Sequence, residues 1–151
     1  MRISQVLASK AAHGGVVTIR PDATVTELLR ALAQQGIGAI VVSDDGRSIA
    51  GIVSERDIVR AMASDPDQGT SGGVRPLPVS RIMTVDVVTL TEDDAVEDAM
   101  RIMTESRIRH LPVLRDGELV GLVSIGDVVK ARLATLEDEK AALVDYVTRG
   151  G

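Results

Sequence analysis

The pattern of hydrophobic and polar positions occurs twice along the chain. A β-branched run at residues 16–19 precedes apolar residues at helical spacing, and a run at residues 87–90 precedes the same arrangement. The matching positions are 71 residues apart (87 − 16) up to a turn and 70 residues apart (121 − 51) after it. An ordered series of matches with a single gap in a turn indicates an internal duplication.

Each copy predicts the element order strand, helix, strand, strand, helix. The runs at residues 16–19 and 87–90 favour short buried strands. The helix that follows has apolar residues at i, i+3, i+4 and i+7, which share one face. These residues are Val25, Leu28, Leu29 and Leu32 in the first copy, and Val96, Ala99, Met100 and Met103 in the second.

Polar residues and a glycine predict where these helices begin and end. Thr24 with Glu27 and, in the second copy, Asp94 with Glu97 have the spacing of an N-terminal capping box. Gly36 follows the first helix. Glycine commonly ends helices because it adopts the left-handed conformation at low cost.

The remaining strands of each copy predict a hairpin. Asp-Gly pairs between apolar runs are strong hairpin signals, and they stand at residues 45–46 and 116–117. The predicted strands are residues 39–42 and 49–53 in the first copy, and 111–114 and 119–123 in the second.

These elements predict an α/β (α+β) fold class. One β-α-β-β-α unit has about 50 residues, too few for an independent core, so the two copies are expected to pack together. A helical lead-in opens each repeat, and residues rich in Pro and Gly separate the repeats as a flexible linker. The expected organisation is repeat 1 at residues 1–63, the linker at 64–78, repeat 2 at 79–133 and a tail helix at 134–151.

The tail has a heptad-like seam. Its members step by 4, 3, 4, 3 and 4 residues: Val129, Leu133, Leu136, Lys140, Leu143 and Val147. One interpretation is a helix that lies on its own protein, and the other is a helix that pairs across a homodimer. The sequence leaves both open.

Composition narrows the classes of function. Hydrophobic residues make up 44% and charged residues 26% of the chain, which is typical of a soluble globular protein. Aromatic residues make up only 1%, which argues against base-stacking platforms for nucleic acid. The net charge of −5 argues against broad binding to nucleic acid or anionic membranes. The sequence contains no cysteine, which excludes disulfides and thiolate nucleophiles but is compatible with any redox compartment. It has no apolar run that approaches a membrane span and no visible secretory signal, so the cytoplasm is the default expectation.

The element Gly-x-Val-Ser-x-x-Asp ends at Asp57 in the first copy and at Asp127 in the second. A purely structural interpretation is two capping boxes with Ser54 and Ser124 as N-caps. A functional interpretation uses the same geometry, because free N–H groups at a helix start hold phosphate. The carboxylate one turn later accepts hydrogen bonds from two ribose hydroxyls, and neighbouring strands sandwich a flat base. The pattern thus predicts adenosine-phosphate sites built without aromatic residues.

A basic element distinguishes the second copy from the first. Arg107, Arg109 and His110 stand between its helix and strand, where the first copy has glycine and alanine backbone. Arginine suits bidentate phosphate contacts, and the alternative is a solvated loop with cations at a helix C-terminus. Pro112 predicts that its strand lies at a sheet edge or contains a bulge.

Together these features resemble a tandem pair of CBS domains (a Bateman module), such as the stand-alone bacterial CBS-pair proteins. The resemblance covers residues 1–132 and also rests on Ile82-Met83-Thr84 and on Arg-His-Leu-Pro-Val at residues 109–113. It implies two repeats packed sheet to sheet with pseudo-twofold symmetry, two clefts for ligands and a homodimer. The ligands that it implies are AMP, ADP, ATP, S-adenosylmethionine and, in some members, NAD(H).

The resemblance also implies roles for residues at matching positions. Asp57 and Asp127 would bind ribose hydroxyls, and Ser54 and Ser124 would contact phosphate. The residues implied to frame the base are Gly38, Ala39, Val87 and Ile108, and those implied to contact phosphate or ribose are Thr84, Arg109 and His110. The first copy lacks the Arg-His pair, so its anionic ligand would need Arg56 or arginines across the cleft. Whether the two sites are equally occupied is therefore open.

The sequence thus predicts a regulatory module that binds an adenosyl nucleotide and is not an enzyme. It contains no dinucleotide-binding, Walker A or nucleophile-elbow motif. Its two histidines, His13 and His110, lie in different copies without metal-ligand spacing, so no metal site is expected. The alternative is a structural homodimerisation module without ligand. The sequence does not identify an effector protein that responds to this module.

Overall fold

The computed structural model of the protein describes residues 1–11, 15–65 and 72–150. His13 and residues 66–71 of the predicted linker lie outside the described residues. None of the helices in these ranges combines the length and the apolar composition that crossing a bilayer requires.

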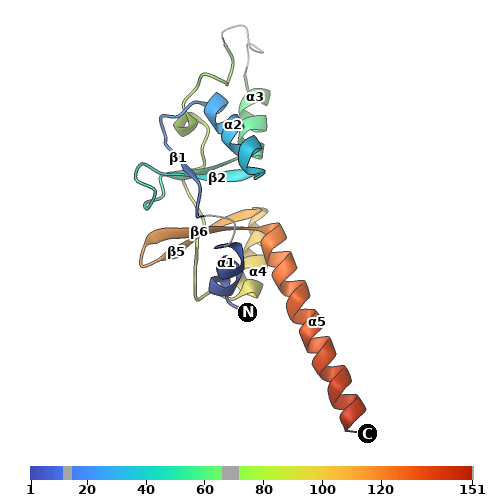
Figure 1. Ribbon diagram of the computed structural model, residues 1–151. Helices are drawn as coiled ribbons and strands as arrows, with labels where there is room; N and C mark the ends of the chain where they lie inside the picture. The colour runs from blue at the N-terminus through green and yellow to red at the C-terminus, as the bar shows by residue number, and fades with distance from the viewer. Residues whose placement is uncertain (12–14, 66–71, 151) are drawn as a thin grey trace. The chain divides into compact units, whose positions relative to one another are not determined.

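The first repeat forms a three-stranded sheet in the order β1-β2-β3 (Figure 1). Strand β1 pairs parallel with β2, and β2 pairs antiparallel with β3. Its elements are β1 (Thr18–Ile19), α2 (Val25–Gln35), β2 (Ala39–Val42), β3 (Gly51–Ser54) and α3 (Glu55–Ala63). The predicted element order of this copy is confirmed, with a shorter first strand than residues 16–19.

The second repeat forms a three-stranded sheet in the order β4-β5-β6. Its elements are β4 (Leu90–Thr91), α4 (Val96–Ser106), β5 (His110–Arg115), β6 (Glu118–Ser124) and α5 (Ile125–Arg149). The predicted tail and the last helix of the repeat are thus one helix. The α/β fold class is confirmed, and the lead-ins are α1 (Ile3–Lys10) and the short 3-10 helix η2 (Val79–Arg81).

The helix faces predicted from apolar spacing are largely buried. The core of the first repeat includes Val25, Leu28 and Leu32 of α2, packed with residues of β2, β3 and α3. In α4 the equivalent residues Val96, Ala99 and Met103 are buried. The stabilisation comes from burying aliphatic surface, because the chain has almost no aromatic residues.

Each compact unit of the chain contains the lead-in that precedes the other repeat in the sequence. One unit contains Val16–Val88 with Arg115–Val120, and the other contains Met1–Gly15, Thr89–Leu114 and Gly121–Gly151. Helix α1 therefore belongs with the second repeat, where Ile3 N–H donates to the Asp94 carbonyl (2.9 Å). The η2 segment belongs with the first repeat, where Val79 N–H donates to the Ala23 carbonyl (2.7 Å).

The capping prediction is confirmed for α2 and wrong for α4. Thr24 and Glu27 form the capping box of α2, and Gly36 ends that helix with φ of 62°. Helix α4 begins at Val96 with Ala95 as its N-cap, which has no side-chain acceptor. Asp94 lies one residue too early and instead accepts a hydrogen bond from Thr91 N–H (2.7 Å).

The two predicted hairpin turns differ in length. Asp116 and Gly117 form a two-residue turn with φ of 52° and 82°, as the Asp-Gly signal predicts. In the first repeat the loop is longer, since β3 begins only at Gly51. There the Asp45 carboxylate accepts hydrogen bonds from the N–H groups of Ser48 and Arg47, which hold its pKa far below the ordinary value.

Of the two alternatives predicted from Pro112, the edge strand is wrong, and the bulge stays a prediction. Strand β5 is the central strand of its sheet, not an edge strand. The proline is tolerated because β4 pairs only with Val113 and Leu114, so the ladder on that side starts after Pro112.

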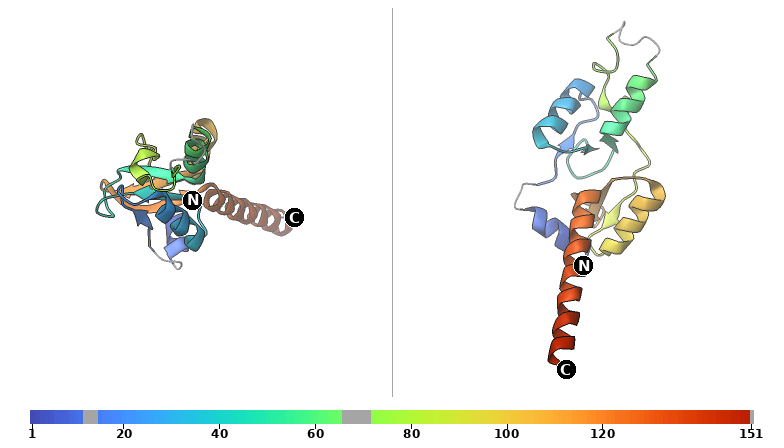
Figure 2. Two further views of the ribbon diagram at one scale, coloured as in Figure 1. Left: turned by 90° about the horizontal axis from the view of Figure 1, so that it is seen from above. Right: turned by 90° about the vertical axis from the view of Figure 1, so that its right-hand side faces the viewer.

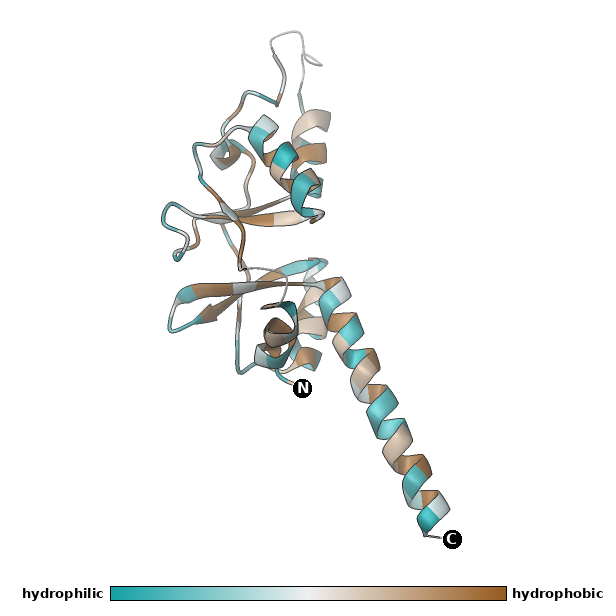
Figure 3. Ribbon diagram, in the orientation of Figure 1, coloured by the Kyte–Doolittle hydropathy of each residue, from teal (hydrophilic) through white to brown (hydrophobic). Residues whose placement is uncertain are grey.

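The seam of the tail helix is exposed. Figure 3 shows hydrophobic and hydrophilic positions alternating along this helix. Its apolar side chains are between 43% and 70% exposed: Val129, Leu133, Leu136, Leu143 and Val147. Figure 2 shows that the later turns of α5 run away from α1 and α4 of the same unit. The early turns of α5 pack against α4 and α1, whereas the later turns do not lie on their own unit.

Candidate functional site

The corner between β3 and α3 brings Ser54 and Asp57 together. Ser54 is the N-cap of α3, in extended conformation, and its hydroxyl accepts from Asp57 N–H (3.4 Å). The Asp57 Oδ2 accepts from Ser54 N–H (2.8 Å) and from the Ser54 hydroxyl (3.1 Å). The capping box of the structural interpretation is therefore present, and it fixes the carboxylate at the helix start.

Thr84 joins this corner from the lead-in of the second repeat. Its backbone exchanges two hydrogen bonds with Ile52 of β3, at 2.8 and 2.9 Å. This pairing places the Thr84 hydroxyl 3.4 Å from Asp57 Oδ1. Three of the predicted site residues thus meet in one compact unit.

Gly51 is a residue whose role the sequence analysis missed. A Cβ at this position would lie 2.7 Å from Met83 Sδ and 2.8 Å from the Thr84 carbonyl oxygen. Glycine therefore lets the lead-in segment pack against β3 and bring Thr84 to Asp57. The equivalent Gly121 is also restricted, but by a side chain, because its Cβ would collide with Leu7. The sequence signal for this role was the glycine that begins the Gly-x-Val-Ser-x-x-Asp element in both copies.

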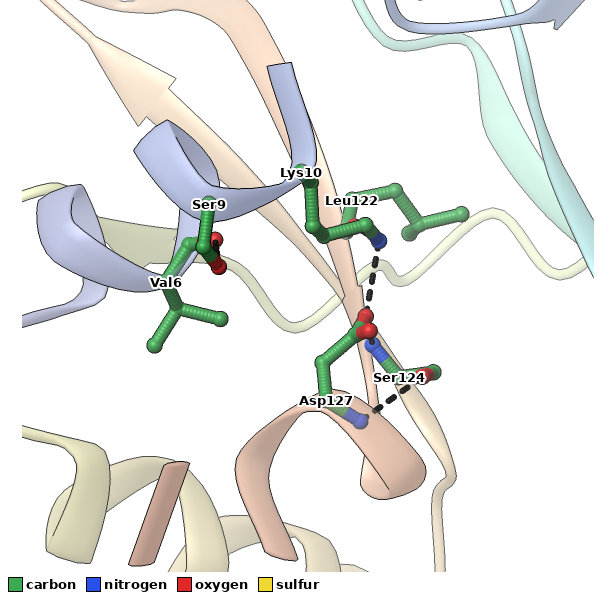
Figure 4. A network of polar contacts seen from close by, with 6 residues as sticks. All are labelled: Val6, Ser9, Lys10, Leu122, Ser124 and Asp127. Atoms are coloured by element: carbon green, nitrogen blue, oxygen red, sulfur yellow. Dashed lines mark hydrogen bonds and ion pairs between the residues drawn. The ribbon is translucent and has the colours of Figure 1, made fainter. Parts of the chain in front are cut away.

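The equivalent corner between β6 and α5 contains Ser124 and Asp127. Asp127 Oδ2 accepts from Ser124 N–H (2.8 Å), and the Ser124 hydroxyl accepts from Asp127 N–H (3.2 Å). A further group is present here: Lys10 Nζ lies 2.7 Å from Asp127 Oδ2 and 2.7 Å from the Leu122 carbonyl (Figure 4). Lys10 comes from α1, and the sequence analysis did not identify it.

These contacts shift the pKa of Asp127. Burial alone raises the pKa of this carboxyl, but hydrogen bonds from Lys10 and Ser124 outweigh the burial and hold the pKa below its ordinary value. Asp127 is therefore a charged acceptor at neutral pH, next to a bound ammonium group.

The other predicted residues of the first repeat lie around its corner. The Gly38 carbonyl accepts from Glu55 N–H (3.0 Å), which ties the start of β2 to the start of α3. Ala39 is buried in β2, and Arg56 is exposed on the first turn of α3. Val87 is half-buried, in the segment between Thr84 and β4.

The basic element of the second repeat occupies the matching place. The Arg109 carbonyl accepts from Ile125 N–H (2.8 Å), as Gly38 does in the first repeat. Arg109 is exposed, and His110 at the start of β5 and Ile108 are half-buried. The structure therefore brings this basic element to the start of α5, where Ile125 directly follows Ser124.

An open hollow of about 600 Å³ lies in the unit that contains the first repeat, between the end of α2 and α3. Its lining includes Gly38 and Glu55 at the corner, and the apolar side chains of Ile37, Ile58 and Val59. Within the described ranges, no three His, Asp or Glu side chains gather as a set of metal ligands.

The fold and the two corners define a duplicated α/β module, and comparison with known proteins gives its family. The chain belongs to the CBS-domain family, whose model matches residues 9–64 and 79–134. A curated relative is the CBS domain-containing protein CBSX3, mitochondrial, of Arabidopsis thaliana. It is 37% identical over 98% of this chain and 72% of its own length.

Solved structures agree with this assignment. The CBS-domain containing protein ATU1752 from Agrobacterium tumefaciens is 40% identical with a TM-score of 0.76, covering 87% of this chain and 99% of its own. The structure of CBSX2 in complex with AMP is 26% identical with a TM-score of 0.67, covering 80% of this chain and 89% of its own. CBSX2 thus shows that a protein with this fold binds an adenine nucleotide.

Proposed function

We propose that the chain is a regulatory module that binds an adenine nucleotide at each of its two Ser–Asp corners. The observation that carries the proposal is the repeated geometry: in both repeats a carboxylate accepts the N–H of the capping serine at 2.8 Å. Two equivalent corners fit two binding sites better than one active site, so we propose no catalytic activity. The AMP complex of CBSX2 supports an adenosyl ligand.

The residues are assigned as the family resemblance implies. Asp57 and Asp127 accept the ribose hydroxyls, and Ser54 and Ser124 with the helix N-termini contact phosphate. The residues proposed to frame the base are Gly38, Ala39, Val87 and Ile108, and those proposed to contact phosphate or ribose are Thr84, Arg109, His110 and Arg56. The proximity of Thr84 to Asp57 supports this assignment in the first repeat.

The proposed ligand class is an adenosyl nucleotide. It includes AMP, ADP, ATP, NAD(H) and S-adenosylmethionine, and AMP is the first probe because CBSX2 binds it. The proposed role in the cell is sensing. A ligand that binds one of two conformational states of the module more tightly shifts the equilibrium toward that state. The expected location in the cytoplasm stays a prediction.

The test is calorimetric titration of AMP into wild type and the Asp57→Ala/Asp127→Ala variant. We expect AMP binding by wild type and its loss in the variant, with the fold retained by circular dichroism. Glu27→Ala is the matched control, because Glu27 also closes a capping box but lies outside both sites. Normal AMP binding by the double variant would show that the ribose assignment is wrong.

We also propose that the protein forms a homodimer. The exposed apolar seam of α5 supports this, since such a stripe is costly to leave in water. If AMP, ATP, NADH and S-adenosylmethionine all fail to bind to wild type, dimerisation without ligand becomes the better account of the module.

A further inference from the structure

The lead-in segments give the two carboxylates different partners. Met83 and Leu7 are equivalent, because each packs where a Cβ would be needed on the glycine of its repeat. The residue after Met83 is Thr84, whose neutral hydroxyl lies 3.4 Å from Asp57. The residue after Leu7 is Ala8, which has no polar group, and Lys10 contacts Asp127 instead.

Lys10 is anchored by two acceptors at once. Its ammonium group lies 2.7 Å from Asp127 Oδ2 and 2.7 Å from the Leu122 carbonyl oxygen (Figure 4). The pair is partly shielded from water, with side-chain exposures of 41% for Lys10 and 24% for Asp127. Lys10 is therefore a resident partner of the carboxylate that the second site uses.

A resident ammonium group weakens a carboxylate as an acceptor for ribose. A hydrogen bond from an ammonium to a carboxylate is stronger than one from a neutral hydroxyl, because the donor is also charged. Lys10 and the Ser124 N–H both contact Asp127 Oδ2, so a ribose hydroxyl at this oxygen must compete with them. A ribose hydroxyl at Oδ1 meets a carboxylate whose charge the neighbouring ammonium group already offsets, so its hydrogen bond is weaker. At Asp57 the Ser54 and Thr84 hydroxyls that contact the carboxylate are neutral donors.

We propose, on the basis of the adenosine sites described above, that Lys10 makes the two sites unequal. Nucleotide fills the Asp57 site first, and the Asp127 site binds the same ribose more weakly because Lys10 already engages its carboxylate. Lys10 is thus a residue that sets ligand affinity at one site only. The consequence is a response that extends over a wider range of ligand concentration than two equal sites would give.

The test isolates the Asp127 site by titrating AMP into proteins with the Asp57→Ala substitution. Adding Lys10→Met should tighten AMP binding about three- to fivefold, the range for a partly exposed ion pair. Lys10→Arg keeps the cation and should leave the weak binding unchanged. Lys130→Met is the matched control, because it removes the same charge from an exposed position on α5. Lys10→Gln is a second neutral variant, and circular dichroism checks the fold of each.

The outcomes separate this inference from the proposed function. Tighter binding with Lys10→Met and Lys10→Gln, but not with Lys130→Met, supports it. Unchanged or weaker AMP binding in both Lys10 variants overturns it while leaving two nucleotide sites in place. If wild type binds AMP with two equal affinities, the inference also fails. If wild type binds no AMP, the proposed function fails and this inference fails with it.

Discussion

Asp57 and Asp127 show what the sequence predicts for a single residue. Their capping boxes follow from the Ser-x-x-Asp spacing, and the structure confirms both boxes. Their other partners do not follow from local spacing, because Thr84 is 27 positions from Asp57 and Lys10 is 117 positions from Asp127. The family resemblance named Thr84 as a site residue but not its contact with Asp57, and the sequence analysis did not identify Lys10. Contacts between distant segments depend on packing, which local spacing does not predict.

The titration of Asp127 is a prediction at this scale. Its pKa is held below the ordinary value, so the stability that it contributes is present above the unfolded-state pKa and is lost as pH falls through the lower folded-state pKa. Lys10→Met removes one cause of the lowering and should raise the pKa. Carboxyl ¹³C chemical shifts followed against pH in both proteins measure the change. An unchanged pKa in the variant would contradict the ion pair.

At the scale of elements, apolar periodicity predicts the order and type of the helices and strands. It is less accurate at their ends, as the short β1 and β4 show. The two errors share a cause. Asp94 suits a cap by residue type but lies one position before the observed N-cap, and Pro112 suits an edge by residue type but lies just outside a two-residue ladder. Both depend on where neighbouring segments stop, which residue type alone does not encode.

The prediction at the scale of elements concerns Gly51 and Gly121, which occupy equivalent positions in the two repeats. Gly51→Ala should lower the free energy of unfolding by about 2 kcal/mol, because the new Cβ meets the Thr84 carbonyl, which is fixed by backbone hydrogen bonds. Gly121→Ala should cost less, about 1 kcal/mol, because it meets only the end of the Leu7 side chain, which has other rotamers. Urea denaturation of both variants measures the difference. Equal costs, or a larger cost at Gly121, would contradict this account of Gly51.

At the scale of the whole molecule, the sequence predicts the seam of α5 but does not decide what the seam contacts. The heptad spacing predicts a seam, and the structure shows that its apolar side chains are exposed. The seam also contains Lys140. A charged residue inside a helical seam costs stability and restricts the registers in which two such helices pair. The proposed homodimer is therefore expected to have one specific arrangement of its tail helices.

Disruption of the seam is the prediction for the whole molecule. Leu136→Lys with Leu143→Lys places two charges in the seam and should raise the dissociation constant of the proposed homodimer at least about a hundredfold. Ala141→Lys with Ala142→Lys adds the same charge to the same helix outside the seam and should leave the dimer intact. Sedimentation velocity over a range of protein concentrations measures both. If the seam variant dimerises like wild type, α5 does not join the subunits.

The exchange of lead-ins has a consequence for how such a chain is assembled. Each compact unit contains the lead-in that precedes the other repeat in the sequence: Met1–Gly15 lies with the second repeat, and the η2 segment lies with the first. In a polypeptide of one repeat alone, the lead-in would therefore not pack on its own repeat. Such a chain would complete a unit only by exchanging its lead-in with a second molecule. Because the two repeats are joined in one chain, this exchange is intramolecular. Folding of the two units therefore does not depend on protein concentration.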